Sequence, residues 1–379
     1  MEYLLEGFQA IGQNPKMIAM WIIGGVLIYL AIKKDMEPAL LLPMGFGAIL
    51  VNLPLSPVIK DNGIINSLFQ VGIAASEAMP LLLFIGIGCM IDFGPLLSNP
   101  KLFILGGAAQ LGIFITVILA VMIGFPLDAA SSIGIIGAAD GPTAIHVANT
   151  LLGGGNPFNT LVGPITVVAY SYMALVPIVQ PAVMKLCTTK KERVIKMKYN
   201  AKQVSRLMRI LFPIIVTIVS GLIAPESISL VGMLMFGNLL RECGVLKSLS
   251  ETAQTTFSNI ITLLLGITIA FQMQADQFIK VETLIIMVLG LFAFVFDTFG
   301  GVMCAKIMNL FSKEKINPML GAAGISAFPM ASRVVAKMGT KEDPSNHLLM
   351  HAVGANVSGQ IASAIVGGLI IGILGPFCL

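Results

Sequence analysis

Long apolar runs, separated by short polar stretches, make up most of the 379-residue chain. A helix that crosses a membrane requires about 20 consecutive, mostly apolar residues. We therefore predict spanning helices near residues 17–32, 102–125, 161–184, 210–224, 228–240 and 281–296. The segment 1–16 has two glutamates and no basic cluster, unlike a cleaved signal, so we expect the first helix to be retained. The pattern predicts an all-α polytopic membrane protein.

Composition supports a lipid environment for most of the chain. Hydrophobic residues account for 56% of the sequence and charged residues for 11%, and the mean hydropathy is +0.92. A soluble protein needs more polar residues to cover its surface. The five cysteines occur singly, with no CxxC pair and no clustering with the three histidines. Neither a disulfide framework nor a zinc site is expected.

Basic residues concentrate in one segment near the middle of the chain. Residues 185–209 contain nine Lys or Arg and a single acid, Glu192. By the positive-inside rule this segment is expected to be cytoplasmic. It lacks the interleaved aromatic residues typical of RNA-binding segments, so no nucleic-acid partner is expected. We divide the chain into a first membrane half (1–184), a basic cytoplasmic linker (185–209) and a second membrane half (210–379).

The two halves share short sequence matches in the same order. Residues 81–87 resemble 263–267, residues 137–140 resemble 321–324, and residues 162–164 resemble 353–355. At the shared glycine or valine, these pairs are 180, 184 and 191 residues apart. Internal repeats of this kind are common in transporters, where inverted halves bring interrupted helices together. We expect two inverted repeats whose broken helices meet near the midplane.

Asp140 is the only acid in the mostly apolar run 131–145, and Gly141 and Pro142 follow it directly. Proline removes a backbone donor and interrupts the helix, so carbonyl groups near Ala138 are free to face a cation together with the carboxylate. Such a set of oxygen atoms suits a hard cation such as Na⁺. Asp140 alternatively caps the helix that follows. Because a lone carboxylate in a membrane is costly, we favour a functional role.

The second half offers neutral oxygen donors around the matching position. Gly324 stands where the first half has Asp140, and it lies near Asn317, Gly321 and Ser326. Alone, an Asn before a Pro is an ordinary helix cap, and a Ser in a helix commonly bonds to its own backbone. Their symmetry with Asp140 is what indicates a shared site.

Further polar residues lie in apolar surroundings. Asn356 and Gln360 are one turn apart on a helix face of small residues, and close helix packing alone explains the glycines of that face. An amide at membrane depth needs partners, and the Asn356 carbonyl is a competent ligand for an alkali cation, so a structural and a functional role for Asn356 both stay open. Tyr170 and Tyr172 point to different helix faces, so at most one is expected to reach the site. Asp297, between two apolar stretches, is a candidate second functional acid.

The segment 137–143, the series Asn317, Gly321, Ser326 and Arg333, and the segment 356–359 resemble the β subunit of the sodium-pumping biotin-dependent decarboxylases. These complexes act on oxaloacetate, methylmalonyl-CoA, glutaconyl-CoA or malonate, and the resemblance covers nearly the whole chain. It implies that the chain decarboxylates carboxybiotin delivered on a separate carrier subunit, consumes a proton from the far side and exports Na⁺.

The resemblance also implies residue roles. Catalytic roles fall to Tyr172, which would handle a proton, to Ser326, and to Arg333, which would also bind carboxybiotin. The implied Na⁺ ligands are Asp140, Asn317, Gly321, Ser326 and Asn356.

The resemblance further implies a multi-pass protein of a bacterial or archaeal inner membrane, with a mobile core that moves against a scaffold. The implied partners are the biotin carrier protein, the carboxyltransferase subunit, a small membrane-anchor subunit, and two further copies of this subunit in a homotrimer. Without the resemblance, two alternatives stay open: a Na⁺-coupled secondary transporter without decarboxylase activity, and a structural membrane subunit. The carboxyl donor is chosen by another subunit, so this sequence does not indicate it.

Overall fold

A computed structural model of the chain describes residues 2–34, 36–153, 155–197 and 204–378. These residues form helices and connecting loops, and none of them lies in a β-strand. Six of the helices are long and apolar enough to cross a membrane, or up to eight if each sharply bent pair is one span, among the residues described. The prediction of an all-α polytopic membrane protein is confirmed.

The predicted spans coincide with helices of the structure. The run 102–125 is divided into two helices at Ala109 and Gln110, and the last predicted span continues to Phe311. The helices up to the linker are α1 (Glu2–Gln13), α2 (Lys16–Lys34), α3 (Pro38–Val51), η1 (Pro57–Ile59), α4 (Ile64–Phe69), η2 (Gln70–Ala74), α5 (Ala78–Met90), α6 (Gly94–Ser98), α7 (Leu102–Ala108), α8 (Leu111–Ile123), α9 (Leu127–Gly134), η3 (Ile135–Ala138), α10 (Gly141–Leu152), η4 (Asn159–Leu161) and α11 (Val162–Cys187).

The linker contains the short helix α12 (Lys190–Arg193), and its residues 198–203, which include the basic Lys198 and Lys202, lie outside the described residues. The helices that follow are α13 (Arg206–Ile223), η5 (Pro225–Ser227), α14 (Ile228–Glu242), α15 (Lys247–Thr252), η6 (Ala253–Phe257), α16 (Ser258–Ile269), η7 (Ala270–Met273), α17 (Ala275–Phe278), α18 (Val281–Phe311), η8 (Pro318–Gly324), α19 (Met330–Glu342) and α20 (Leu349–Cys378).

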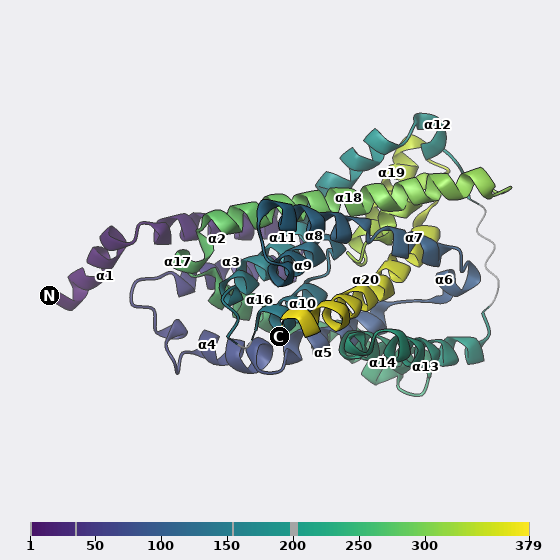
Figure 1. Cartoon of the computed structure of the whole chain (residues 1–379). Coiled ribbons are helices and arrows are strands. Elements are labelled where there is room, and N and C mark those ends of the chain that lie inside the picture. Colours follow the sequence, from purple (N-terminus) through teal and green to yellow (C-terminus); the bar gives the residue numbers. More distant parts are fainter. Residues whose placement is uncertain (1, 35, 154, 198–203, 379) are drawn as a thin grey trace.

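The bundle has two distinct ends, which we name the linker side and the far side. On the far side, Asn14 before α2 bonds Asp276 of α17 at 2.9 Å, and Asn52 after α3 bonds the carbonyl of Met273 at 2.8 Å. On the linker side, Arg209 at the start of α13 lies 3.8 Å from Asp92, which follows α5. Figure 1 shows the linker at the right end of the bundle and the N-terminus at the left.

Following the chain between these ends shows that the halves run in opposite directions. Helices α2, α3, α5, α7–α8 and α11 of the first half correspond in order to α13, α14, α15–α16, α18 and α20 of the second. The contacts follow the same inversion, because α3 packs against α16 while α5 packs against α14. Both α5 and α16 follow a π-helical turn, η2 and η6 respectively. The predicted inverted repeat is therefore present in the fold.

Each half also contains one helical hairpin that enters the bundle from one side and returns to it. In the first half, α9 and η3 run inward from the far side and α10 leads back. In the second half, η8 runs inward from the linker side and α19 leads back. The predicted broken helices are these two hairpins, which enter the bundle from opposite ends.

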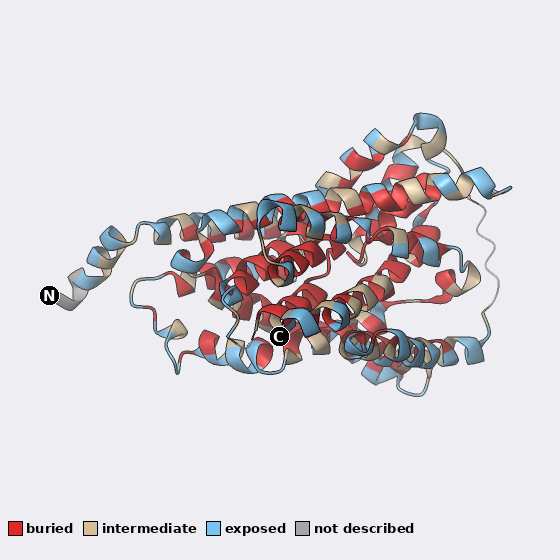
Figure 2. Ribbon diagram, in the orientation of Figure 1, coloured by how far each residue is buried: buried red, intermediate tan, exposed pale blue. Residues whose placement is uncertain are grey.

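Burial separates the peripheral helices from the interior. The outermost spans are α2 and α13, whose exposed side chains are mainly apolar, as lipid-facing surfaces require. Buried residues concentrate in the two hairpins and in α11, α18 and α20, which pack around them, as Figure 2 shows. The polar residues that the sequence singles out thus lie in the best-packed part of the protein.

Candidate functional site

The two hairpins meet tip to tip. The backbone N–H of Ser326, which follows η8, donates to the carbonyl of Ala138 at the end of η3, at 3.1 Å. Next in the chain, Ala139 has φ 52°, a left-handed conformation that is rare outside glycine and is often found at functional sites. This turn aims the following residue, Asp140, into the junction between the hairpins.

Helix α20 runs beside the second tip and holds it through side-chain amides. Asn356 Nδ2 donates to the carbonyl of Ile325 at 2.6 Å, and Gln360 Nε2 donates to the carbonyl of Ser326. In return, the Ser326 hydroxyl donates to the carbonyl of Gly359 at 3.1 Å. Helix α20 thus supplies hydrogen-bond donors to the buried backbone carbonyls of Ile325 and Ser326 at the tip.

Asp140 is buried at this junction, with 3% of its surface exposed. It occupies the N-cap position of α10, yet its side chain makes no capping hydrogen bond. Instead, Oδ2 accepts from the hydroxyl of Thr143 at 2.5 Å and from the hydroxyl of Ser363, on α20, at 3.3 Å. The two hydroxyls orient the carboxylate without neutralising its charge, which leaves it available to a proton or a cation.

The amides that hold the second tip have unused oxygen atoms. Because carbonyl groups only accept, the Asn356 and Gln360 nitrogens must face them and the amide oxygens must point elsewhere. Both oxygens are buried and have no hydrogen-bond partner among the described residues. With Asp140 at the same junction, these oxygens would offer an oxygen-only donor set, which suits a hard cation such as Na⁺. No cluster of three or more His, Cys, Asp or Glu residues occurs in the described part of the chain.

Thr143 and Ser363 are site residues that the sequence interpretation missed. A partial signal exists for Ser363, because Asn356, Gln360 and Ser363 follow the i, i+4, i+7 spacing of one helix face. Serine is common among the small residues of packed membrane helices, so it does not stand out there. For Thr143, the contact depends on the side-chain rotamer of Asp140 rather than on any pattern.

Asn317 lies at the opposite end of η8 from Ser326. Its Oδ1 caps η8 by accepting from the N–H of Met319 at 3.1 Å, and its Nδ2 donates to the linker carbonyls of Arg193 and Ile195 at 2.8 and 2.9 Å. At about 2 Å rise per residue, the seven residues of η8 separate Asn317 from the hairpin tips by roughly 14 Å. These hydrogen bonds tie Asn317 to the linker rather than to Asp140.

Gly321 lies between these two ends, where η8 crosses α18. A Cβ at Gly321 would collide with the backbone carbonyl of Gly301, and a Cβ at Gly301 would collide with that of Gly321. Only glycine permits this backbone approach. Nearby, Gln180 of α11 donates to the carbonyl of Ala322 at 2.6 Å. Gly321 therefore has a packing role, because it lets η8 approach α18 closely.

The two tyrosines of α11 point in different directions. The ring of Tyr170 packs on Gly141, the residue that follows Asp140, and its buried hydroxyl has no partner among the described residues. Tyr172 instead donates to the carbonyl of Met287 and packs on Gly290 of α18. The tyrosine next to the Asp140 carboxylate is Tyr170.

Asp297 of α18 is a second buried carboxylate near the first hairpin. Its Oδ1 accepts from the N–H of Gly112 at 2.5 Å, while Oδ2 faces Gly137 and has no hydrogen-bond partner among the described residues. The same oxygen is fully buried. Asp297 therefore joins α8, η3 and α18, beside the segment that positions Asp140.

Arg333 is exposed in the first turns of α19, on the linker side of the hairpin tips. Lys337 and Lys341 follow it at four-residue intervals and are also exposed, so the three cations form one row along the helix. None of the three pairs with an acidic residue in the described part of the chain. The row extends from the linker side toward the junction of the hairpins.

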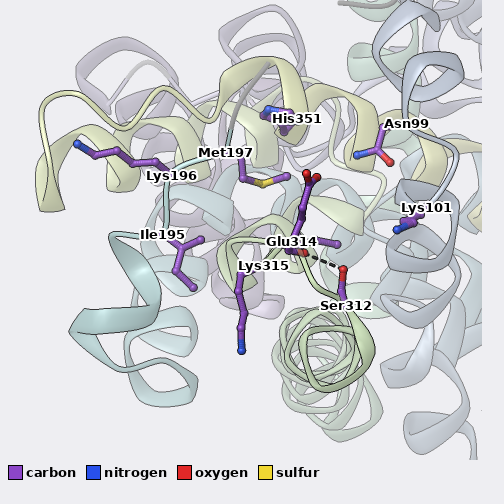
Figure 3. Close-up of a pocket in the computed structure, with 10 residues that line it drawn as sticks. Asn99, Lys101, Ile195, Lys196, Met197, Ser312, Glu314, Lys315 and His351 are labelled. Carbon is purple, nitrogen blue, oxygen red and sulfur yellow. Dashed lines mark hydrogen bonds between the residues drawn. The ribbon is translucent and has the colours of Figure 1, made fainter. Parts of the chain in front are cut away.

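A pocket of about 440 Å³ opens beside Asn317 on the linker side. Figure 3 shows Met197, Glu314 and His351 at its centre and the amines of Lys101, Lys196 and Lys315 around it. The linker, which forms one side of this pocket, is joined to the end of α19 by two ion pairs. Arg193 pairs with Glu342 at 2.9 Å, and Lys196 pairs with Asp343 at 3.1 Å.

Asp343 also accepts hydrogen bonds from the backbone N–H and the hydroxyl of Ser345, at 2.9 and 2.7 Å. Hydrogen bonds from Ser345, and then from Lys196, lower the pKa of Asp343 to about 2. The Asp343 carboxylate is therefore charged at neutral pH, as its ion pair with Lys196 requires.

Comparison with known proteins identifies the group to which this architecture belongs. Residues 16–374 match the family described as Na⁺-transporting oxaloacetate decarboxylase beta subunit. The methylmalonyl-CoA decarboxylase subunit beta of Propionigenium modestum is 47% identical over 392 aligned positions, which cover 96% of each chain.

Relatives with other carboxyl donors are similar over almost the same length. The glutaconyl-CoA decarboxylase subunit beta of Acidaminococcus fermentans is 45% identical, covering 94% of this chain and 92% of its own. The oxaloacetate decarboxylase beta chain of Klebsiella pneumoniae is 40% identical, covering 97% of both chains. The chain therefore belongs to the family of beta subunits of Na⁺-transporting decarboxylases.

Proposed function

We propose that this protein is the membrane subunit that decarboxylates carboxybiotin and couples that reaction to Na⁺ export. The observation that carries the proposal is the Asp140 carboxylate at the junction of two opposed hairpins, with unpaired amide oxygens of Asn356 and Gln360 close to the same junction. A charged ligand between two halves of opposite orientation is the arrangement expected where an ion crosses a membrane.

The Na⁺ ligands we propose are Asp140, Ser326 and Asn356, as the family resemblance implies, with Thr143 and Ser363 orienting the carboxylate. Asn317 and Gly321 belong to the implied set as well. Their contacts with the linker and with Gly301 support a role in shaping η8, the segment that leads to the second hairpin tip.

The decarboxylation step depends on control of one proton. N-carboxybiotin is a carbamate anion: when its C–N bond breaks, CO₂ leaves and the electron pair stays on the ureido nitrogen, which takes up a proton. A positioned acid therefore determines when the reaction occurs. Tyr172 is the proton-handling tyrosine that the resemblance implies, and the proximity of Tyr170 to Asp140 supports Tyr170 as a second candidate.

Arg333 is the proposed binding residue for the carboxylate of carboxybiotin. A guanidinium binds a carboxylate through two parallel hydrogen bonds, and Arg333 has no competing acid among the described residues. Lys337 and Lys341 would draw the anion along α19 toward Arg333, which requires that it arrive from the linker side.

Coupling follows if Na⁺ and H⁺ compete for Asp140. Each ligand lowers the affinity of the other by the same factor, because the linkage is reciprocal. A proton that reaches Asp140 thus promotes release of Na⁺, and the same proton is later consumed by the ureido nitrogen. The energy of decarboxylation then drives Na⁺ across the membrane.

The beta-subunit names of the relatives imply a multi-subunit complex in a membrane. For this chain we propose a biotin carrier protein, a carboxyltransferase subunit and a small membrane-anchor subunit as partners, a homotrimer of the chain itself, and a bacterial or archaeal inner membrane as its location. The basic linker side would then face the cytoplasm.

One experiment tests reaction and transport together. The purified complex is reconstituted in proteoliposomes, free carboxybiotin is supplied, and CO₂ release and the uptake of labelled Na⁺ are followed. The proposal requires Na⁺-dependent CO₂ release with simultaneous Na⁺ uptake. Na⁺ movement without CO₂ release would instead identify a secondary transporter, and neither activity would identify a structural subunit.

A further inference from the structure

A histidine and a glutamate form a close pair on the far side of the Na⁺ site. Nδ1 of His146, on α10, lies 2.5 Å from Oε2 of Glu77, at the start of α5, and both side chains are about 15% exposed. Nε2 of the same ring lies 3.2 Å from the hydroxyl of Ser229 on α14. The ring is thus held on both nitrogens, between the two halves of the protein.

The backbone at Glu77 is unusual as well. Glu77 has φ 52°, a left-handed conformation, and it lies at a 67° bend between the helical segments Pro57–Ala74 and Ala78–Met90. A bulky residue in this conformation costs energy and persists only where the surrounding structure requires it. The bend carries the carboxylate of Glu77 inward to meet His146.

A polar pocket connects Glu77, one member of this pair, to the far side. It has a volume of about 360 Å³, it is lined by Glu77, Asn149, Asn159 and Gln272 among others, and it lies against the loop between α10 and α11. Gln272 is only 7% exposed, and its amide oxygen has no hydrogen-bond partner in the described part of the chain. A pocket of this polarity at the end of a membrane bundle is a place for water.

The same helix connects the pair to the Na⁺ site. Thr143, His146 and Asn149 follow one another at three-residue intervals along α10, and side chains with this spacing stand about 5–6 Å apart at their Cβ atoms. Thr143 donates to Asp140, and Asn149 lines the far-side pocket. The polar side chains of α10 therefore form a stripe from the pocket to the carboxylate.

The charges around His146 favour proton uptake from the far side. Glu77 faces the ring from α5, and Glu226 of η5 is close enough for its charge to act on the ring. On the remaining elements packed against α10, Asp128 of α9 is engaged with Asn156 at 2.7 Å, and Tyr170 of α11 faces Gly141. An imidazole in contact with one carboxylate, with a second acid nearby, attracts a proton and not an anion.

We propose that Glu77 and His146 form the proton entrance of this pump, passing a proton from the far-side pocket along α10 to Asp140. This inference rests on the proposed function and deepens it. The proton binds Glu77 or His146 from water in the pocket, moves by way of the Thr143 hydroxyl to Asp140 as Na⁺ leaves, and ends on the ureido nitrogen from which CO₂ departs. One positive charge enters the site for each one displaced, so no net charge is left buried.

The test uses proteoliposomes in which the linker side of the reconstituted complex faces outward, so that the far side faces the lumen. CO₂ release from carboxybiotin is measured while the lumenal pH is changed and the external pH is held constant. For the unmodified protein we expect the rate to fall as the lumenal pH rises. For His146→Gln we expect a rate at least about tenfold lower that no longer responds to lumenal pH.

Two further variants complete the test. Glu77→Gln keeps the shape and a hydrogen-bond acceptor for His146, and it is expected to lose the response to lumenal pH as well. Thr150→Val removes an exposed hydroxyl of α10 that donates to the His146 carbonyl at 2.8 Å, and it is expected to keep the full response. Stabilisation by Na⁺ against thermal unfolding shows that each variant retains its fold and its cation site.

A full lumenal pH response in either His146→Gln or Glu77→Gln would overturn the proposal and reduce the pair to a structural contact between the halves. If one of the two fails to fold, the other decides the question. Failure of the proposed function gives a separate result, because the unmodified complex would then show no Na⁺-dependent CO₂ release at any lumenal pH.

Discussion

The backbone N–H of Ser326 lies 3.1 Å from the carbonyl oxygen of Ala138, and this bond joins the tips of two hairpins that enter the membrane bundle from opposite ends. The bond connects the first half to the second at the depth where Asp140 lies. Any motion of one hairpin relative to the other must break it or move both tips. A cation bound at the junction would therefore respond to the relative position of the two halves.

The first prediction concerns Gln360, one of the two α20 amides that hold the second hairpin tip. In Gln360→Leu, the buried carbonyl of Ser326 loses its donor, which should cost about 1–3 kcal/mol of stability. Thermal unfolding with and without Na⁺ should show a lower Tm and weaker protection by Na⁺. The control is Gln277→Leu, which changes an exposed glutamine of α17. Equal unfolding temperatures for the two variants would contradict this stabilising role of Gln360.

The hydroxyls that orient Asp140 provide the second prediction. Thr143→Val preserves shape and removes a 2.5 Å hydrogen bond, whereas Ser363→Ala removes a 3.3 Å bond. Residues that orient a ligand usually contribute about 10–100-fold to cation affinity. We expect Thr143→Val to weaken Na⁺ affinity in this range and Ser363→Ala to weaken it less. Na⁺ titrations monitored by thermal protection check the order, and a larger effect at Ser363 would contradict it.

The cationic row of α19 provides the third prediction. Arg333→Lys retains the charge but not the two parallel hydrogen bonds, so the carboxybiotin concentration for half-maximal CO₂ release should rise by roughly tenfold. Thermal protection by Na⁺ should stay the same, because Arg333 is exposed and is not one of the proposed cation ligands. Arg241→Lys, which changes another linker-side arginine, is the matched control. A loss of Na⁺ protection in Arg333→Lys would count against this division of roles.

Asp297 provides the fourth prediction. Its Oδ1 accepts from the N–H of Gly112, and an asparagine oxygen can replace it. Asp297→Asn should therefore keep the fold, whereas Asp297→Leu should leave a buried N–H unpaired and cost about 1–3 kcal/mol. Comparing the Tm of the two variants checks this. If Asp297→Asn keeps its Tm but loses CO₂ release, then Asp297 is a functional acid and not only a link between α8 and α18.

The sequence predicts the fold well because lipid imposes simple rules. Apolar runs must be helical, and a lone carboxylate followed by Gly141 and Pro142 must lie in an interruption. The repeat could be predicted because the same interruption occurs again around Gly321. These features depend on local residue types, which are visible without any knowledge of tertiary contacts.

Details of the site depend instead on how distant helices are rotated against each other. Tyr170 and Tyr172 have the same composition around them, and only the packing of α11 on Gly141 brings Tyr170 next to Asp140. The sequence match between the halves suggests that Asn317 shares a site with Asp140. In the structure, however, the side-chain amide of Asn317 donates to the linker carbonyl of Ile195. The Na⁺-ligand roles of Asn317 and Gly321 and the proton role of Tyr172 stay predictions.

The carboxylate of Asp140 is the centre of this account, and one substitution tests it directly. Asp140→Asn is isosteric and keeps an acceptor for Thr143, so the complex should assemble and keep its Tm in the absence of Na⁺. In proteoliposomes supplied with free carboxybiotin, both Na⁺ uptake and Na⁺-dependent CO₂ release should fall by more than about 100-fold, or roughly 2.7 kcal/mol. Na⁺ uptake at the rate of the unmodified complex would contradict the account, because the charged ligand would then lie elsewhere.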